Sequence, residues 1–373
     1  MEDAKATQGD PADEERQAAI NQKVDVAATF GNLAQILEIA PQATHLKGRL
    51  PGEVTALIRA AREGHADVVR ALIPLSDSLH PGEFGQNALN AAVMSGEIEC
   101  VKALLPFYKE PGEENTRRSA LRFAIRSKKI EIVQLLVDWC DVKSPFLNGE
   151  TALMIAASDG NAQMVKLLLP LSDPDARNED GKTALMEAIH SQAPMDCLRI
   201  LFAASDPSIQ TQQGTTLLMF AAVTGHLGAI ELVAPASDFL TRRQDGWTAL
   251  MCAAAFGNAD AIALLLPGSD PSARDKEGCQ AFDLAQMAKS WASVDLLAEH
   301  TDAEKAAAAL REAGAERMPR WAAKMEARSL AAEIAESAQK AAAAARQEGA
   351  GNDENAENAS AAASANARGA RRV

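Results

Sequence analysis

A repeated phrase sets the strongest limit on how this chain can fold. The stretch from Leu167 to Leu185 reads LLLPLSDPDARNEDGKTAL, and the stretch from Leu264 to Phe282 reads LLLPGSDPSARDKEGCQAF. The two copies start 97 residues apart, a distance that three units of 32 or 33 residues would fill. A repeat of that length predicts small supersecondary units that stack on one another, because a single unit cannot bury its own apolar face.

The units align on one apolar reference residue, the last letter of TAL in GKTAL. The reference residues follow one another at spacings of 32 or 33: Val24, Leu57, Leu89, Leu121, Leu153, Leu185, Leu218, Leu250 and Phe282. An alanine stands three positions after each of them. This row predicts about nine helices, each with a small residue on the face that approaches a neighbouring helix closely.

Polar and helix-breaking residues mark the ends of the predicted helices. Two positions before the reference residue stand side chains that can cap a helix start, namely Thr55, Asn87, Ser119, Thr151, Thr183, Thr216 and Thr248. The end units have Gln22 and Gln280 there instead. Glycine is predicted to end the first helix in six units, at Gly31, Gly64, Gly96, Gly160, Gly225 and Gly257. Proline is predicted to end the second helix, at Pro41, Pro74, Pro106, Pro170, Pro235 and Pro267.

Three segments carry a family resemblance: DGKTALMEAI, NGETALMIAASDGNAQMVKLLL and DGWTALMCAAAFGNADAIALLL. They resemble the ankyrin repeat, and the resemblance covers residues 17–302. It implies an all-α solenoid of stacked helix-turn-helix units, in which His65 and His226 hydrogen-bond between repeats. The chain departs from the family pattern with Ala for Pro and Met for His in TALM, and with a connection after the second helix that is one residue shorter. An extra residue within 190–194 predicts a local bulge in one helix–helix turn.

The flanking segments differ from the array in composition. Residues 1–16 are acidic and polar and are predicted to be disordered. Residues 303–373 contain 28 alanines. Within them, 303–348 are predicted to form Ala-rich helices, whose first part is a candidate cap for the last repeat. The alternative is that the longer of these helices binds a partner or self-associates. Residues 349–373 are predicted to be a disordered tail.

The composition argues against several classes of function. A net charge of −14 disfavours nucleic acid and anionic membranes as partners. The chain shows no membrane-length apolar run and no secretory signal, which predicts a cytoplasmic protein. The odd count of five cysteines without C-x-x-C spacing predicts free thiols in a reducing compartment. No catalytic, metal-binding or cofactor-binding motif is recognisable, so the chain is predicted not to be an enzyme and to need no cofactor.

The resemblance places binding on the concave face, which is made by the loop tips and the exposed side of each first helix. Aromatic and arginine side chains are the usual energetic centres of interfaces. The candidates of these types are Trp247, Arg242, Arg243, Phe146, Arg59, Arg62, Arg126 and Phe256. Trp247 is the strongest of them, because it precedes a capping threonine and is expected to be at least partly exposed. Three apolar residues that stand two positions after a reference residue could instead pack between repeats: Phe123, Ile155 and Phe220.

The leading hypothesis is a non-enzymatic scaffold that binds a protein partner on the concave face of the array. One alternative is a secreted effector of a pathogen or symbiont that acts through the same surface. Others are a regulatory module or an oligomer-forming element with the C-terminal helix as the contact. The sequence does not identify the partner.

Overall fold

The computed structural model describes residues 11–43, 46, 54–76 and 87–301. These ranges contain helices, turns and loops and no strand. The expected segments 303–348 and 349–373 lie outside the described residues. At the other end, helix α1 spans Pro11–Thr29, so the expected start of the array at residue 17 falls inside this helix. The chain divides into two compact units, residues 1–212 and residues 213–373.

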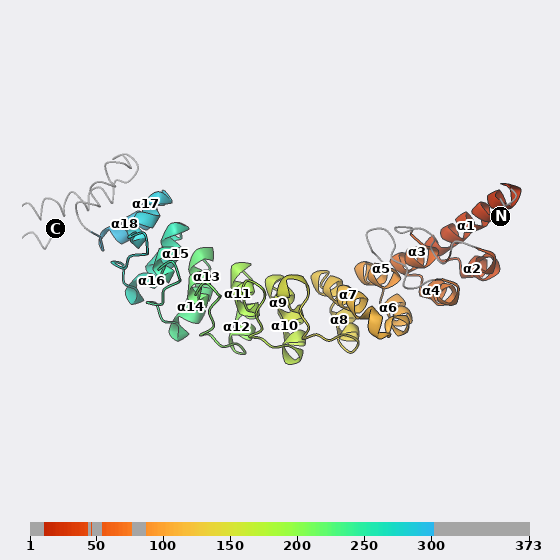
Figure 1. The fold of residues 1–373 in the computed structure, drawn as a ribbon, viewed down its shortest axis with the longest axis horizontal. Helices are drawn as coiled ribbons and strands as arrows, with labels where there is room; N and C mark the ends of the chain where they lie inside the picture. The colour runs from red at the N-terminus through yellow and green to blue at the C-terminus, as the bar shows by residue number, and fades with distance from the viewer. Residues whose placement is uncertain (1–10, 44–45, 47–53, 77–86, 302–373) are drawn as a thin grey trace, which may run out of the picture. The chain divides into compact units, whose positions relative to one another are not determined.

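The first unit contains six helix pairs (Figure 1). Their first helices are α1, α3 (Ala56–Glu63), α5 (Ala88–Ser95), α7 (Glu114–Arg126), α9 (Ala152–Ser158) and α11 (Ala184–His190). Their second helices are α2 (Leu33–Ile39), α4 (Ala66–Leu72), α6 (Ile98–Leu104), α8 (Ile130–Leu136), α10 (Ala162–Leu168) and α12 (Met195–Phe202). Each helix packs on its counterpart in the next pair, so this unit has a layer of first helices and a layer of second helices.

The second unit repeats the same arrangement with three described pairs. The first helices are α13 (Leu217–Thr224), α15 (Ala249–Ala255) and α17 (Ala281–Met287). The second helices are α14 (Leu227–Val233), α16 (Ala259–Leu265) and α18 (Trp291–Ala298). Within this unit too, α13, α15 and α17 pack in sequence, and so do α14, α16 and α18.

The predicted alanine row lies buried where first helices pack on one another. All nine of these alanines are at most 1% exposed. The reference residues are equally buried, from Val24 at 0% to Phe282 at 2%. A methyl side chain at this position lets neighbouring helices approach, and the larger apolar residue beside it fills the remaining space. The prediction of a stacked core is therefore confirmed.

The predicted caps are present at six of the seven positions. The side chains of Thr55, Asn87, Thr151, Thr183, Thr216 and Thr248 each accept a bond from the backbone N–H three residues later. The prediction for Ser119 is wrong, because this residue lies inside α7. A short 3-10 helix, Pro111–Glu113, precedes α7 and starts the helical segment well before Ser119. In this repeat no glycine-containing turn interrupts the helix just before that position.

The turn between the two helices of a repeat requires a left-handed residue. The six predicted glycines all have positive φ, from 63° at Gly160 to 89° at Gly96. In the three other repeats, Lys128, Gln192 and Lys289 have the same conformation, with φ between 55° and 58°. The turn is thus imposed by packing even where the residue disfavours it. The extra residue in 190–194 lengthens this connection, which has four residues between α11 and α12 and three between α9 and α10.

Each predicted proline lies just after its second helix rather than at the last helical residue. The α-helix ends and a short 3-10 helix follows, with proline as its second residue. These segments are η1 (Ala40–Gln42), η2 (Ile73–Leu75), η4 (Leu105–Tyr108), η7 (Leu169–Leu171), η8 (Ala234–Ala236) and η9 (Leu266–Gly268). The shortened connection to the next repeat is therefore built on a 3-10 turn, which suits proline because its fixed φ is compatible with the turn.

Candidate functional site

Short turns form the tips of the loops that join the repeats. In four of them the first residue donates its N–H to the carbonyl of the fifth: 146 to 150, 178 to 182, 243 to 247 and 275 to 279. The fourth residue is a glycine with positive φ in each. Neighbouring tips also bond to each other, through Glu179 N to Asn148 O at 3.1 Å in the first unit and Lys276 N to Asp245 O at 3.0 Å in the second. Side chains on the tips are therefore held in fixed positions within each unit.

Trp247 and two arginine candidates lie together on one tip of the second unit. Trp247 is half-buried, and the Arg243 guanidinium lies over its ring, 5.7 Å from the centroid. The same guanidinium pairs with Asp245 at 2.9 Å. Arg242 is exposed and donates to the carbonyl oxygen of Arg274 at 2.7 Å. Arg243 thus makes its contacts inside its own turn, whereas Arg242 extends to the next one.

Cys252 lies close to this turn and is fully buried in α15. Burial raises the pKa of the Cys252 thiol to about 12, and the neighbouring Arg243 guanidinium opposes that rise. The thiol is therefore protonated and unreactive in the folded protein at neutral pH.

Phe146 lies on a tip of the first unit and meets an arginine from another element. The guanidinium of Arg118, in α7, lies 5.5 Å from the Phe146 ring centroid. The same group donates to the carbonyl oxygen of Pro145. Phe146 is half-buried, and the adjacent Leu147 is 74% exposed. This contact joins α7 to the following loop, 27 residues further along the chain.

Arg118 belongs to a row of three arginines on α7. Arg118, Arg122 and Arg126 are spaced by four residues, which places them on one side of the helix. Arg122 and Arg126 both pair with Glu150, at 3.5 and 3.8 Å. Arg126 was a candidate from the sequence, but Arg118 and Arg122 were not. The four-residue spacing within ENTRRSALRFAIR is the signal that could have identified them.

The remaining candidates lie on first helices. Arg59 is half-buried in α3 and its Nε lies 3.9 Å from a carboxylate oxygen of Asp25. Arg62 is exposed in the last turn of the same helix. Phe256 follows α15 and is 60% exposed. The structure therefore distributes the eight candidates over several repeats and brings only Arg242, Arg243 and Trp247 together. Phe146 forms its cluster with Arg118, which was not a candidate.

Large apolar side chains recur at the exposed ends of first helices. Five or six positions after the reference residue stand Phe30, Met94, Phe256 and Met287, which are 77%, 43%, 60% and 68% exposed. In contrast, Ile155 and Phe220, two positions after it, are 4% and 9% exposed. The packing interpretation of Ile155 and Phe220 is therefore confirmed, while the helix ends present apolar area to solvent.

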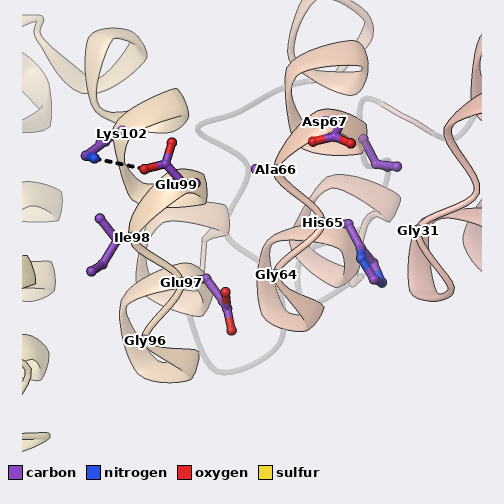
Figure 2. A pocket seen from close by; sticks show the side chains of 11 residues that line it. Gly31, Gly64, His65, Ala66, Asp67, Gly96, Glu97, Ile98, Glu99 and Lys102 are labelled. Atoms are coloured by element: carbon purple, nitrogen blue, oxygen red, sulfur yellow. Dashed lines mark hydrogen bonds and ion pairs between the residues drawn. The ribbon is translucent and has the colours of Figure 1, made fainter.

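A hollow lies at the helix–helix turns of the first repeats (Figure 2). It has a volume of about 640 Å³ and is lined by Gly31, Gly64, Gly96 and polar side chains such as His65, Glu97 and Lys102. A Cβ at Gly31 would lie 2.5 Å from the His65 ring, and one at Gly64 would lie 2.5 Å from the Glu97 carboxyl. The glycines thus make room for the side chain of the next repeat, and the hollow is a consequence of stacking.

The two histidines implied to bridge repeats make different contacts. His65 Nε2 lies 2.9 Å from the carbonyl oxygen of Thr29 in the preceding repeat, as the resemblance implied. His226 Nδ1 accepts from Ala229 N at 3.2 Å and caps its own helix, α14. Asn258 also bonds between repeats, because its side-chain amide donates to Ala222 O and Val223 O, both at 2.8 Å.

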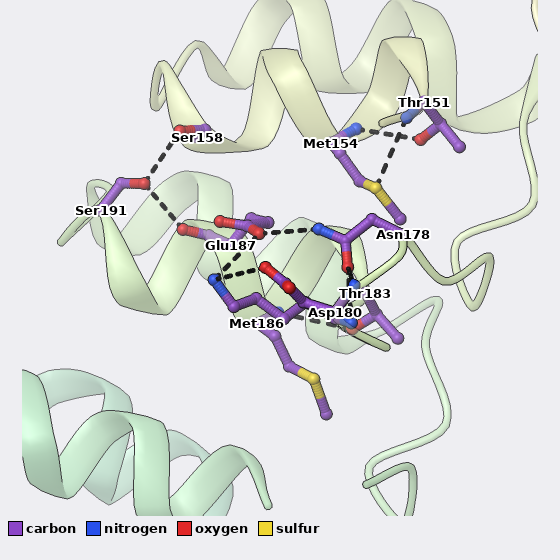
Figure 3. Close-up of polar contacts among 10 residues, drawn as sticks. Thr151, Met154, Ser158, Asn178, Asp180, Thr183, Met186, Glu187 and Ser191 are labelled. Atoms are coloured by element: carbon purple, nitrogen blue, oxygen red, sulfur yellow. Dashed lines mark hydrogen bonds and ion pairs between the residues drawn. The ribbon is translucent and has the colours of Figure 1, made fainter. Parts of the chain in front are cut away.

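The polar groups around α9 and α11 serve the connection between repeats (Figure 3). Ser158 and Ser191 share a hydroxyl contact of 2.9 Å, and Ser191 also donates to Glu187 O. Asn178 and Lys182 of the loop both contact the Glu187 carboxylate, at 3.1 and 3.4 Å. Every charged group in this cluster has a protein partner, so the cluster explains the loop geometry without a ligand.

The described residues hold no group of three or more His, Cys, Asp or Glu side chains arranged to bind a metal ion. All five cysteines are free thiols, as predicted. Burial raises the pKa of the thiols of Cys100, Cys140 and Cys197 to about 11. No helix in the described ranges has the length and apolar character that crossing a membrane requires.

Helix pairs that recur every 32 or 33 residues, a buried alanine row and stacked loop tips define an all-α repeat protein. A family model described as ankyrin repeats, in copies of three, matches the chain at residues 25–119, 57–145, 121–211, 191–275 and 218–307. These matches cover well over half of the chain, and the protein therefore belongs to the ankyrin-repeat family. The comparison with curated proteins finds no match.

Proposed function

We propose that this chain is a non-enzymatic scaffold that binds a protein partner through the exposed ends of its first helices and its loop tips. Ankyrin repeats are in general protein–protein interaction modules. The observation that carries the proposal is the recurrence of exposed apolar side chains five or six positions after the reference residue, as at Phe256 and Met287. Exposed apolar area at a fixed, rigid place in successive repeats is typical of a docking surface.

The eight candidate residues contribute to this proposal to different degrees. The exposed candidates Phe256, Arg62, Arg126 and Arg242 are available to a partner without any rearrangement. Trp247 and Arg243 are half-buried and contact each other, so they support a binding surface mainly by shaping the loop tip. The cytoplasmic location expected from the sequence remains part of the proposal.

Affinity capture with the full chain as bait tests this function. The Phe256→Ser and Met287→Ser double variant removes two exposed apolar side chains of neighbouring repeats in the second unit. We expect it to weaken the captured partner's binding by about 2 kcal/mol or more, the size of an interface hot spot, in titration calorimetry. Leu240→Ser is the matched control, because Leu240 is 57% exposed but lies on a loop.

Two outcomes would contradict the proposal. A partner that binds the double variant as tightly as the original chain does not use the helix ends. Equal losses for the double variant and for Leu240→Ser would show a general response to lost surface hydrophobicity instead of a localised docking surface. Thermal melts of all three proteins check that each variant is folded.

A further inference from the structure

The arginine row of α7 borders a groove that the repeat architecture does not require. The groove has a volume of about 330 Å³ and is lined by Asn115, Arg118, Ser119, Arg122, Pro145, Phe146 and Leu147. One wall is the helix and the other is the 145–147 segment of the following loop. The first wall is cationic and the second is apolar.

The cationic wall has more positive charge than its neighbours neutralise. Arg122 and Arg126 share the single carboxylate of Glu150. Arg118 contacts a carbonyl oxygen and an aromatic ring, and no described carboxylate forms an ion pair with it. The Nε atoms of Arg118 and Arg122 are buried and lack a hydrogen-bond partner. Three guanidinium groups therefore have two carboxylates near them, Glu150 in ion pairs and Asp141, which attracts Arg118 from further away. The row is a local excess of positive charge in a chain whose net charge is −14.

The contacts already present hold the guanidinium groups in position. The side chain of Arg122 is 30% exposed, and the Phe146 ring stacks against Arg118. A guanidinium that is fixed before binding loses less conformational freedom when it meets a carboxylate, and it offers two parallel N–H donors. Leu147, at 74% exposed, adds apolar area at the edge of the groove.

We propose that this groove binds an acidic peptide segment of a partner protein, with carboxylates on Arg118 and Arg122 and an apolar side chain against Phe146 and Leu147. Charge complementarity selects this occupant, because a cationic wall on an otherwise acidic protein attracts an anionic ligand. The apolar wall favours a peptide over a simple anion, since a free phosphate would leave it uncovered. The inference rests on the proposed interaction function and assigns one surface to it.

Fluorescence anisotropy with the full chain tests the inference. The probe is a short labelled peptide of glutamates around one phenylalanine. We expect it to bind at low salt, with affinity that falls as ionic strength rises. Arg118→Gln and Arg122→Gln should each weaken binding by about tenfold or more, because each removes a charge-assisted contact. Arg70→Gln is the matched control, since Arg70 also pairs with carboxylates, Asp67 and Glu99, but lies on α4.

Variant probes separate the two walls. Replacing the phenylalanine of the peptide by serine should weaken binding, and replacing its glutamates by lysines should abolish it. The inference is overturned if the glutamate peptide does not bind at low salt, or if it binds Arg118→Gln and Arg122→Gln as it binds the original chain. It is also overturned if inorganic phosphate or mixed-sequence RNA displaces the peptide more effectively than unlabelled peptide does.

The result is distinguishable from failure of the proposed function. Partner capture that depends on Phe256 and Met287 while the peptide fails to bind would remove only the groove assignment. Peptide binding that depends on Arg118, without any effect of the Phe256 and Met287 variants on capture, would instead move the docking surface to α7. Circular dichroism of the arginine variants confirms that the helical content is unchanged.

Discussion

The repeats that begin with α7 and with α15 differ in how their first helix starts and ends. α15 starts at a capping threonine, Thr248, and ends before a left-handed glycine, Gly257. α7 starts early, carries Ser119 in its interior and ends before a left-handed lysine, Lys128. One repeat follows the sequence pattern at each point, and the other departs from it at both ends.

The arginine–aromatic contacts of the two regions show what the difference means. Arg243 and Trp247 belong to one turn, and Asp245 neutralises the guanidinium within that turn. Arg118 and Phe146 come from different elements, and their contact leaves the guanidinium without an ion pair among the described residues. The two guanidinium–ring distances are similar. In the α15 repeat the guanidinium is neutralised within its own turn, whereas in the α7 repeat it borders a charged groove. Four predictions test how far this contrast extends.

The largest expected effect concerns thiol reactivity. Cys252, in α15, is fully buried with a pKa of about 12, whereas Cys140, after α8, is half-buried with a pKa of about 11. The thiolate is the reactive form, so both should be alkylated far more slowly than a free cysteine at neutral pH, by about a hundredfold or more. Mass spectrometry after timed iodoacetamide treatment should show Cys140 modified before Cys252. If Cys252 is modified first, the α15 repeat does not shield its thiol better than the α7 repeat does.

The alanine row should behave alike in both repeats. Ala124 of α7 and Ala253 of α15 are each fully buried between first helices. Ala124→Leu and Ala253→Leu should each overpack the contact and cost about 1–3 kcal/mol of unfolding free energy. Urea denaturation measures both. An unchanged midpoint for Ala124→Leu alone would mean that the α7 repeat is looser than its buried surface indicates.

Helix caps should separate the two repeats. Thr248 Oγ1 accepts from Met251 N at 3.3 Å, so Thr248→Ala should lower stability by about 1 kcal/mol. Ser119→Ala should leave stability unchanged or raise it slightly, because alanine is the better residue inside a helix. Comparing the two denaturation midpoints is the measurement. If Ser119→Ala lowers stability as much as Thr248→Ala does, Ser119 acts as a helix cap and α7 does not begin before it.

The smallest effect is expected at the turn between the helices. Lys128 has φ of 58°, a conformation that costs a residue with a Cβ more than it costs glycine. Lys128→Gly should raise stability by about 0.5 kcal/mol, since relief of strain exceeds the added flexibility of the unfolded chain. Gly257→Ala should lower it by about 1 kcal/mol. Thermal melts of both variants measure these changes. A lower melting temperature for Lys128→Gly would show that this turn is not strained.

The repeat length, the alanine row, six caps and the left-handed glycines could all be predicted from the sequence. Each of these depends on residues within one unit, where a helix period or a turn preference is legible in a short stretch. The same reasoning named Trp247 and Phe146, because an aromatic residue at a loop tip is visible without knowing its neighbours. It failed at Ser119, where the cap pattern was present but the turn that should precede it was not.

The grouping of the arginines could not be predicted from the sequence and depends on how the repeats pack. Arg118 donates to the Pro145 carbonyl across 27 residues and stacks on the adjacent Phe146, because stacking brings the loop of one repeat onto the helix before it. Arg122 and Arg126 meet on Glu150 for the same reason. Packing likewise forces Lys128 and Gln192 into the conformation that glycine adopts elsewhere. Contacts between repeats join side chains that are distant in sequence. A repeat pattern gives the spacing of the repeats but does not show which side chains meet. The groove beside α7 is formed by such a contact, between Arg118 and the 145–147 segment.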